Sequence, residues 1–409
     1  MKRGDEAVST ERYTKKKDAI IAAATTILNQ DGARGMTLAK VAARVGLITT
    51  SVTYYFKKKD DLAVACFLRT IARLEEVIAA ACAPADPPAR VRLLLANYLA
   101  LDRAIREGAE PPIAVFSDVR TLNEPQLSVV ADAYLGLFRK ARALLDGPGT
   151  QWMDRAVLTA RTHVLLEQLY WSAVWLPRMD VDEYPRIEAR MFDILLHGLA
   201  PEGTGWAPQL LGGFYPEPAD AHEKQSETFL IAATRLINQR GYRGASVERI
   251  SEQLNVTKGS FYHHNDAKDD LVIACFERSF AIVRGIQICA VAQPGTLWDR
   301  LSAIAATMAD FQLSERGPLL RTSSLAALPE DIRHTMVGAA SRLSVRFAGM
   351  IADGIAQGSI RAIDPMIGAQ MLNATLNATS SMGAVLPGVS RSEAVELYAR
   401  PILMGLFAR

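Results

Sequence analysis

The chain has 409 residues, of which 49% are hydrophobic and 22% charged, with 46 Lys and Arg against 44 Asp and Glu. This hydrophobic fraction excludes a mainly disordered chain, and the length predicts two to three domains with cores of their own. The four cysteines form no Cys-x-x-Cys pair, which excludes a disulfide scaffold and argues against a cysteine zinc site. The net charge of +2 says little about partners, because a balanced total can hide a basic face.

The N-terminal segment is charged and polar and lacks the apolar core of a signal peptide, so we expect a cytoplasmic protein. Residues 365–390 carry no charge, but Gln370, Asn373, Asn377 and Pro387 interrupt their apolar pattern. This stretch is therefore expected to form a buried helix and not a membrane span. We expect neither a cofactor nor a bound metal.

An internal repeat with an offset of 209 residues runs through the chain. The segment Asn-Gln-Asp-Gly-Ala-Arg-Gly at residues 29–35 recurs as Asn-Gln-Arg-Gly-Tyr-Arg-Gly at residues 238–244. From residue 29 to residue 67, 13 of 39 positions are identical to those in the second copy, where about two or three are expected by chance. The pattern predicts a tandem duplication.

A stretch rich in proline and glycine separates the two copies and excludes a continuous helix there. Trp206, Phe214 and Tyr215 inside it predict a linker that docks onto a surface. The predicted organisation is a head at residues 1–60, a helical core at 61–200, the linker at 201–225, a second head at 226–268 and a second core at 269–409.

Apolar residues outside the linker follow helical spacing, which predicts an all-α fold. In the first copy, Thr14 is predicted to cap one helix and Gly32 to end it. Thr37 is predicted to cap a short second helix, and residues 48–55 to form a third. Two short helices joined by a tight turn and supported by a preceding helix form a helix-turn-helix.

Three motifs follow one another in the second copy: Ser-Val-Glu-Arg-Ile at residues 246–250, Val-Thr-Lys-Gly-Ser-Phe-Tyr-His-His at 256–264 and Ala-Lys-Asp-Asp-Leu at 267–271. In this order they resemble the DNA-binding domain of the TetR family of bacterial transcription regulators. The resemblance implies two tandem units, each a three-helix DNA-binding head followed by a helical core for ligand binding and dimerisation.

The resemblance also implies DNA contacts in the second head. Lysine, tyrosine and hydroxyl side chains suit phosphate contacts, and side chains of the recognition helix suit base edges. The candidates in this head are Thr257, Lys258, Gly259, Ser260, Tyr262, His263 and Lys268. Lys258, Tyr262 and Lys268 are expected on phosphates, although Tyr262 could instead pack under the motif.

The first head departs from the pattern, because Thr49-Thr50 replaces Lys-Gly and Thr53 replaces tyrosine. Its candidate DNA contacts are Thr37, Thr49, Thr50, Ser51, Thr53, Tyr54, Tyr55 and Lys59. Residues 1–60 nevertheless carry a net charge of +6, against +2 for residues 226–268. The lysines of an N-terminal arm at 2–17 and of residues 57–59 could replace the lost phosphate contact, or they form a solvated surface.

A helix expected over residues 151–175 places four chemically varied side chains on one broad face. His163, Glu167, Tyr170 and Trp171 are the candidate effector-binding residues, with a polar anchor among aromatic rings. An ordinary core or a subunit interface is the alternative. The corresponding residues 371–379 are small and polar, so the halves are expected to bind different effectors, or only one half binds.

Members of the resembled family act as homodimers, and a duplicated chain offers an intramolecular pseudo-dimer instead. Helices over residues 151–177 and 181–199 would then pack on helices over 362–386 and 392–407 in a four-helix bundle. Because the two recognition segments differ, such a chain would prefer an asymmetric operator.

We therefore expect a ligand-responsive repressor that binds double-stranded DNA and an unknown small-molecule effector, as a pseudo-dimer or a homodimer. The alternative is a ligand-binding or protein-interaction module whose heads, one or both, no longer bind DNA. No enzymatic activity is expected, since the sequence lacks a phosphate-binding glycine loop, Gly-x-Ser-x-Gly and His-Glu-x-x-His.

Overall fold

The computed structural model describes residues 2–244, 252, 268–328 and 330–409. Within these residues the chain consists of helices, turns and loops with no β-strand, which confirms the expected all-α class. The chain divides into two compact units. One comprises Met1–Ala79 and Ala100–Lys140, and the other comprises Ala80–Leu99 and Ala141–Arg409. The five segments predicted from the sequence are not tested by this division and stay a prediction.

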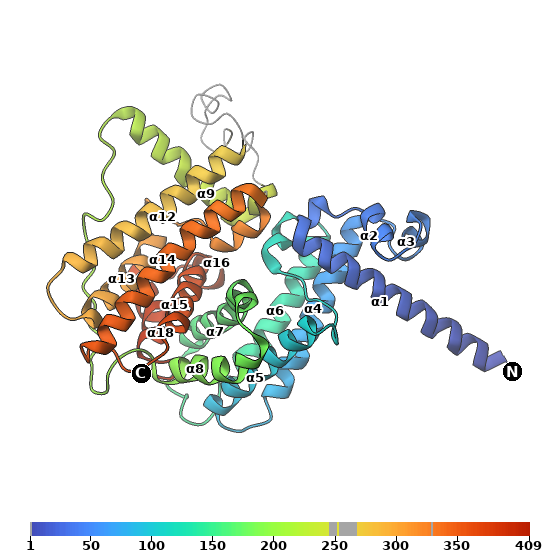
Figure 1. Cartoon of the computed structure of the whole chain (residues 1–409), viewed down its shortest axis with the longest axis horizontal. Coiled ribbons are helices and arrows are strands. Elements are labelled where there is room, and N and C mark those ends of the chain that lie inside the picture. Colours follow the sequence, from blue (N-terminus) through green and yellow to red (C-terminus); the bar gives the residue numbers. More distant parts are fainter. Residues whose placement is uncertain (1, 245–251, 253–267, 329) are drawn as a thin grey trace. The chain divides into compact units, whose positions relative to one another are not determined.

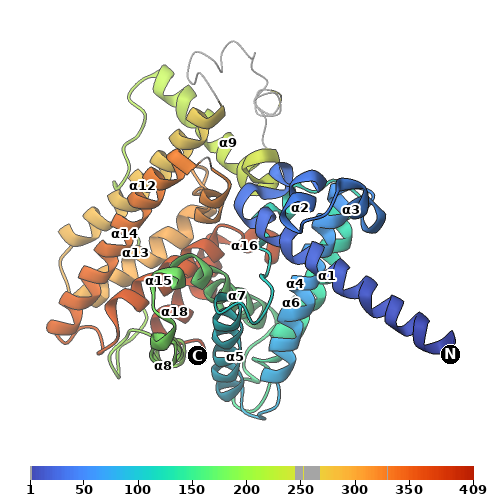
Figure 2. The same cartoon turned by 45° about the vertical axis from the view of Figure 1, so that its right-hand side comes forward.

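The first unit contains the first head and part of the first core. Its elements are α1 (Lys2–Gly35), α2 (Leu38–Arg44), α3 (Thr49–Tyr55), most of α4 (Lys59–Ala81), the end of α5 (Pro87–Arg106), η1 (Phe116–Thr121) and most of α6 (Gln126–Ala143). α2 packs against both α1 and α3 (Figure 2). Buried apolar residues of these helices form the head's core: Ile20, Ala24, Val41, Val52, Leu62 and Phe67.

Helix α1 begins at Lys2, so the predicted cap at Thr14 is wrong, and the basic residues 2–17 lie on this helix. Threonine favours a helix start but does not exclude helix before it, and residues 2–17 contain no proline that would. A salt bridge between Glu11 and Lys15, one turn apart at 2.7 Å, adds to this extension. Gly32 has a φ of 69° and interrupts the helix there, as predicted.

The second unit contains the remaining helices. They are α7 (Arg155–Trp175), η2 (Leu176–Arg178), η3 (Val181–Glu183), α8 (Tyr184–His197), α9 (Ala221–Gly244), α12 (Lys268–Ala292), α13 (Leu297–Gln312), η4 (Thr322–Ala327), α14 (Glu330–Ala356), α15 (Pro365–Thr379), α16 (Met382–Val385), α17 (Arg391–Ala394), the π-helical turn η5 (Val395–Ala399) and α18 (Arg400–Met404). α12 lies beside α9, α13 and α14 (Figure 1). Gly241 interrupts α9 at a φ of 70°, at the repeat position equivalent to Gly32.

Helices from the two halves of the sequence pack together inside this unit. α7 contacts α15, α16 and η5, and α8 contacts α15 and α18. Small and apolar side chains fill one centre of this packing: Ala160, Val164, Ala378, Met382, Ala394 and Tyr398. These helices overlap the four residue ranges named for the bundle, and the pairing of the halves as a pseudo-dimer stays a prediction.

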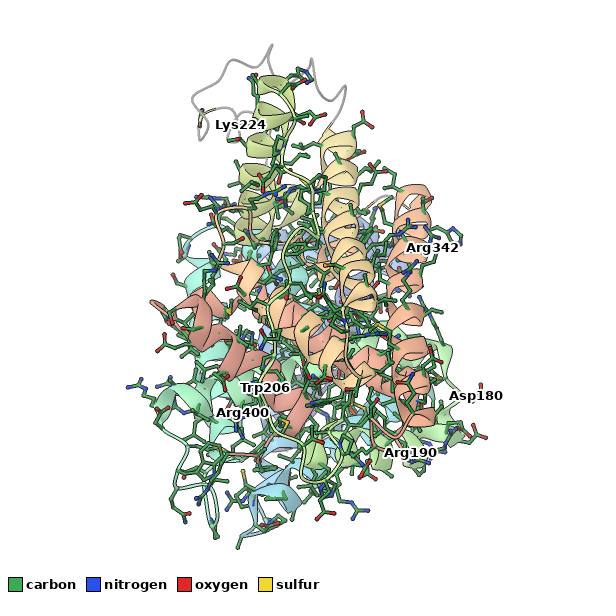
Figure 3. All side chains as sticks on the ribbon, turned by 90° about the vertical axis from the view of Figure 1, so that its left-hand side faces the viewer. Asp180, Arg190, Trp206, Lys224, Arg342 and Arg400 are labelled. Carbon is green, nitrogen blue, oxygen red and sulfur yellow. The ribbon has the colours of Figure 1, made fainter. Side chains whose placement is uncertain are left out.

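The linker packs against the second core, which confirms the predicted docking. Trp206 donates a hydrogen bond to Glu396 at 2.8 Å, and Trp206 lies beside Arg400 in Figure 3. The Phe214 ring meets Phe311 edge-on at 6.0 Å between centroids. The next helix begins at Ala221, inside the predicted linker, because the Asp220 carboxylate accepts a hydrogen bond from an amide of its first turn at 2.8 Å.

None of the helices in the described ranges is long and apolar enough to cross a membrane. The uncharged stretch at residues 365–390 forms α15 and α16, separated by a turn.

Candidate functional site

The first head is built by a local cap and a tight turn. The Thr37 hydroxyl accepts a hydrogen bond from the Lys40 amide at 3.1 Å and caps α2, as predicted. Gly46 has a φ of 67°, which the turn between α2 and α3 requires. Thr37, a candidate DNA contact of the first head, is therefore exposed, and its hydroxyl is already used to cap α2.

Helix α3 presents a row of polar and aromatic side chains to solvent. Thr49, Thr50, Thr53 and Tyr54 are exposed, while Val52 is buried under the helix. The Thr53 hydroxyl donates to the carbonyl oxygen of Thr49 at 2.8 Å. The four exposed residues have spacings of one, three and four, and so share one face. Ser51 and Tyr55 are half-buried.

Three tyrosines gather beside this row. Tyr13 on α1 lies 4.8 Å from Tyr55 and 6.2 Å from Tyr54, measured between ring centroids. Tyr54 and Tyr55 meet edge-on at 5.2 Å. Sequence reasoning missed Tyr13, because it considered only the lysines of the N-terminal arm at residues 2–17. The extended α1 is what brings this ring to α3.

The lysines of the first head divide into engaged and solvent-facing ones. Lys40 pairs with Asp31 at 2.7 Å, and the Lys59 ammonium donates to the carbonyl oxygen of Ala33 at 3.2 Å. Lys57 and Lys58 are exposed in the turn before α4. In the predicted cluster of residues 57–59, these two lysines are therefore more exposed than Lys59.

Most candidate residues of the second head lie outside the described residues: Thr257, Lys258, Gly259, Ser260, Tyr262 and His263. Lys268 begins α12. The contacts assigned to this head therefore stay predictions.

The candidate effector residues on α7 lie where α7 packs on helices of the second half. His163 is buried, with Nδ1 at 3.0 Å from the Tyr398 hydroxyl and Nε2 at 3.2 Å from the Ser381 hydroxyl. Burial and then the charge of Glu167 raise the pKa of Tyr398 well above its ordinary value. His163 and Glu167 thus belong to a polar network between the two halves, and Tyr170 is half-buried on the same helix.

Trp171 joins this network to a cavity in the second core. Its indole nitrogen donates to Gln370 on α15 at 3.0 Å, and its ring lines the cavity. The other lining residues come from α12 to α15 and from the segment before η4: Ser279, Phe280, Val283, Met308, Gln312, Leu319, Leu320, Arg321, Thr322, Ala340, Leu343, Ser344, Asn373, Leu376, Asn377 and Ser380. The cavity has a volume of about 70 Å³, enough for several waters or a few heavy atoms of a ligand.

Hydrogen bonds join the half-buried polar side chains of the cavity. Arg321 donates from Nε to the Ser380 hydroxyl at 3.0 Å, and the Thr322 hydroxyl donates to the Asn377 amide oxygen at 2.6 Å. Met308, Leu319 and Leu320 are buried at the apolar part of the lining. The cavity therefore has a polar, half-buried side and an apolar, buried side.

The same segment is fixed to the helices that carry the second head. The Asn238 amide on α9 donates to the carbonyl oxygen of Leu319 at 2.8 Å and accepts from the backbone of Arg321 at 3.1 Å. The Ser279 hydroxyl on α12 accepts from the Leu320 amide at 2.9 Å. Residues 319–321 thus touch the cavity with their side chains and the head helices with their backbone.

An equivalent clamp exists in the first unit. The Asn29 amide donates to the carbonyl oxygen of Ile113 at 2.8 Å and accepts from the Val115 amide at 2.9 Å. The Thr70 hydroxyl accepts from the Ala114 amide at 2.7 Å. Val115 therefore occupies the place of Arg321, and Phe116 that of Thr322. The Phe116 ring stacks on Phe67 at 6.3 Å between centroids.

Sequence reasoning missed the cavity in the second core. Asn373 and Asn377 were noticed as interruptions of an uncharged apolar stretch, and both line the cavity from α15. Two amides one helical turn apart on an otherwise apolar helix could have indicated a polar lining. No sequence pattern indicated that Arg321 and Thr322 would line the same cavity.

Acidic, histidine and cysteine side chains are not gathered for a metal in the part of the chain that the structure describes, where no group of three or more could hold one. Burial raises the pKa of the Cys66 and Cys275 thiols to about 11 each. Both thiols therefore stay protonated at neutral pH.

Comparison with known protein families bears on the two heads. The family model for "Bacterial regulatory proteins, tetR family" matches at residues 20–66 and again at residues 229–275. Both ends of the two matches differ by the repeat offset of 209 residues. The chain contains two TetR-family heads in tandem.

Individual relatives match parts of this chain. The Transposon Tn10 TetC protein of Escherichia coli is 33% identical over 66 residues, which are 14% of this chain and 34% of that protein, so the chain spans about a third of its length. The structure of AibR in complex with isovaleryl coenzyme A and operator DNA is similar at 20% identity and a TM-score of 0.36, over 43% of this chain and 97% of that one. The regulator FadR from Bacillus subtilis in complex with stearoyl-CoA is similar at 16% identity and a TM-score of 0.37, over 44% and 98%.

Proposed function

We propose that this chain is a ligand-responsive transcription regulator, most simply a repressor, that binds double-stranded DNA through both of its heads. The observation that carries the proposal is the double match to the family's head at the repeat spacing. A chain with two such heads contains in one molecule what a symmetric dimer assembles from two.

The chemistry of the described head supports DNA contact. The exposed hydroxyls of Thr49 and Thr50 and the ring of Tyr54 can reach base edges, the thymine methyl or phosphate oxygens from one face of α3. Lys57 and Lys58 follow that helix and supply positive charge for the phosphate backbone.

The two halves are further proposed to form an intramolecular pseudo-dimer. Reciprocal backbone bonds support this: the Leu199 amide donates to the Leu403 carbonyl at 2.8 Å, and the Leu406 amide donates to the Leu195 carbonyl at 2.6 Å. Such reciprocity is typical of an interface between two-fold related copies.

Glycines permit this close approach from both sides. Gly198 and Gly405 have φ values of 67° and 106°. A Cβ on Gly198 would collide with the Leu403 carbonyl oxygen, and a Cβ on Gly405 with the backbone of Leu196. Each half therefore places a glycine against the other half's last helix.

Buried polar contacts add to the same interface. Gln168 on α7 donates to the Met371 carbonyl and to the Thr375 hydroxyl, both at 3.2 Å. Arg161 donates to the carbonyl oxygens of Leu406 and Ala408. Since the recognition segments differ, with Thr49-Thr50 against Lys258-Gly259, a pair formed inside one chain would bind unlike half-sites and prefer an asymmetric operator.

The route from the cavity to α9 supports the response to a ligand. A ligand that takes the place of Ser380 or Asn377 beside Arg321 would shift residues 319–321, and Asn238 holds those residues to α9. Because α9 belongs to the second head, occupancy of the cavity would bias that head between two positions.

Selection of bound sequences from random duplex DNA tests the proposal. We expect the full chain to enrich one asymmetric sequence, with an affinity that falls steeply with salt. Changing both Lys258 and Tyr262 to alanine is expected to abolish selective binding, because two phosphate contacts are lost. Arg190→Ala, an exposed change on α8, serves as the control and should bind as the unmodified chain does.

Two outcomes would contradict the proposal. Unchanged binding by the Lys258→Ala, Tyr262→Ala variant would show that these residues are not the DNA contacts. Failure of the unmodified chain to enrich any sequence would favour the protein-interaction module instead.

A further inference from the structure

We propose that the cavity of the second core binds a small organic anion with an apolar body, and that Arg321 holds the anionic group. This inference rests on the proposed ligand-responsive function and gives the effector its chemical class.

The charges of the lining point to an anion. Arg321 is the one formally charged side chain among the lining residues that the structure describes, and none of them is acidic. A carboxylate placed beside Arg321 meets a cation, and the described lining residues bring no carboxylate of their own to it. The planar guanidinium also matches a carboxylate in geometry, and its Nε donates to Ser380.

The polar partners of Arg321 complete a site for an oxyanion. The Ser380 hydroxyl accepts from Arg321 and donates to the backbone carbonyl of Asn377, and the side-chain oxygen of Asn377 accepts from the Thr322 hydroxyl. Hydroxyl and amide groups can turn their donors towards an incoming oxygen, so a carboxylate can exchange with the bonds that now join them. All four side chains are half-buried, which strengthens a charge-assisted bond relative to one at the surface.

Other lining residues are apolar and suit the ligand's apolar body. Met308, Leu319 and Leu320 are buried there, and Trp171 and Phe280 add two aromatic rings. Methionine adapts its shape to different apolar groups. The cavity volume of about 70 Å³ suits the apolar body of a small acid.

The first half lacks the anchoring cation. The equivalent clamp on Asn29 holds Val115 where Asn238 holds Arg321. Phe116, at the next position, packs its ring on Phe67. The anion site is therefore proposed for the second half and not for the equivalent position of the first half.

Calorimetric titration of the full chain with matched acids and amides tests this inference. The probes are hexanoate against hexanamide and benzoate against benzamide, which differ in charge and hardly in shape. We expect at least one acid to bind about tenfold or more tightly than its amide, since a charge-assisted hydrogen bond contributes about 1.5–3 kcal/mol.

Arg321→Gln is expected to remove this preference, and Arg321→Lys to retain part of it because the positive charge stays. Arg342→Gln, an equal charge change on α14, is the matched control, since Arg342 is exposed and points away from the helices in Figure 3. This control should keep the full preference. Thermal unfolding of each variant verifies that it folds.

Equal binding of acid and amide, a preference that survives Arg321→Gln, or no binding of either acid at millimolar concentration would overturn the inference. The titrations contain no DNA, so their result is independent of the selection of bound DNA sequences. A chain that binds the acid but enriches no DNA sequence would contradict the proposed function and leave the anion site in place.

Discussion

Glu227, Arg278 and Arg316 form an ion group beneath the linker. Arg278 donates to the Glu227 carboxylate at 2.7 and 3.0 Å, and its side chain is 1% exposed. Arg316 reaches the same carboxylate at 3.4 Å and lies over the Tyr215 ring at 4.5 Å. Burial alone would raise the pKa of Glu227, but the hydrogen bonds and charges of Arg278 and Arg316 outweigh it and lower that pKa.

Glu227→Gln is expected to destabilise the second unit at neutral pH by about 3 kcal/mol, because Arg278 is left buried without its counter-charge. A carboxyl whose pKa is lowered by folding stabilises the fold above its ordinary pKa, and this stabilisation is lost as the pH falls through the folded value. The melting temperature of the variant should therefore fall less than that of the unmodified chain between pH 6 and pH 3, as calorimetry measures.

Glu217→Gln is the matched control for this change. Glu217 also pairs with Arg316, at 2.9 Å, but its side chain is 82% exposed. An exposed pair contributes at most about 1 kcal/mol. Equal losses of stability in the two variants would contradict the role assigned to burial.

At the scale of elements, the linker depends on a glycine in α12. A Cβ on Gly285 would collide with the carbonyl oxygen of Phe214. Gly285→Ala is therefore expected to lift residues 211–215 from the core and to lower the free energy of unfolding by about 1–3 kcal/mol. Limited proteolysis should then cut the linker faster.

Gly349→Ala provides the comparison in α14, where a Cβ meets no atom within 4 Å. Alanine is the better helix former, so this variant should be as stable as the unmodified chain or gain about 0.5–1 kcal/mol. A linker that resists proteolysis equally in both variants would show that it does not dock through Phe214.

The pairing of the halves depends on Gly198 in the same way. Gly198→Ala combines a positive φ with a collision against the Leu403 carbonyl, and should cost about 3 kcal/mol in denaturant unfolding. If the halves pair within one chain, this loss does not depend on protein concentration.

Gly203→Ala is the control that measures the cost of a positive φ without a collision. Gly203 has a φ of 78° but open space around its Cβ position, so alanine there should cost only about 1–2 kcal/mol. Identical losses at positions 198 and 203, or a loss at 198 that grows on dilution, would contradict pairing inside the chain.

Local signals explain what the sequence could predict at this scale. The cap at Thr37, the break at Gly32 and the turn at Gly46 each depend on residues within one helical turn, and the structure contains all three. The repeat located the two heads because identical local signals recur. Helix starts were less predictable. The helices that begin at Lys2 and Ala221 were both predicted to begin at later residues.

The cavity could not be predicted because it depends on contacts between distant segments. Arg321 lies 59 positions before Ser380 in the sequence, and Trp171 comes from the other half of the chain. The effector residues proposed on α7 were singled out by their shared face alone. That face lies against α15 and η5, and only Trp171 among the four lines the cavity.

At the scale of the whole molecule, duplication allows the two halves to diverge. A homodimer must use one head and one core twice, whereas this chain combines a head with Thr49-Thr50 and a head with Lys258-Gly259. The first clamp holds Val115 and the second holds Arg321. Covalent connection keeps the unlike halves at a high effective concentration, so neither half needs to recognise a second copy of the chain.

Native mass spectrometry of the chain bound to its selected duplex measures this arrangement directly. A pair of heads inside one chain predicts a complex of one chain and one duplex, with the same stoichiometry across a hundredfold range of protein concentration. Two chains on each duplex, formed cooperatively as the concentration rises, would contradict it.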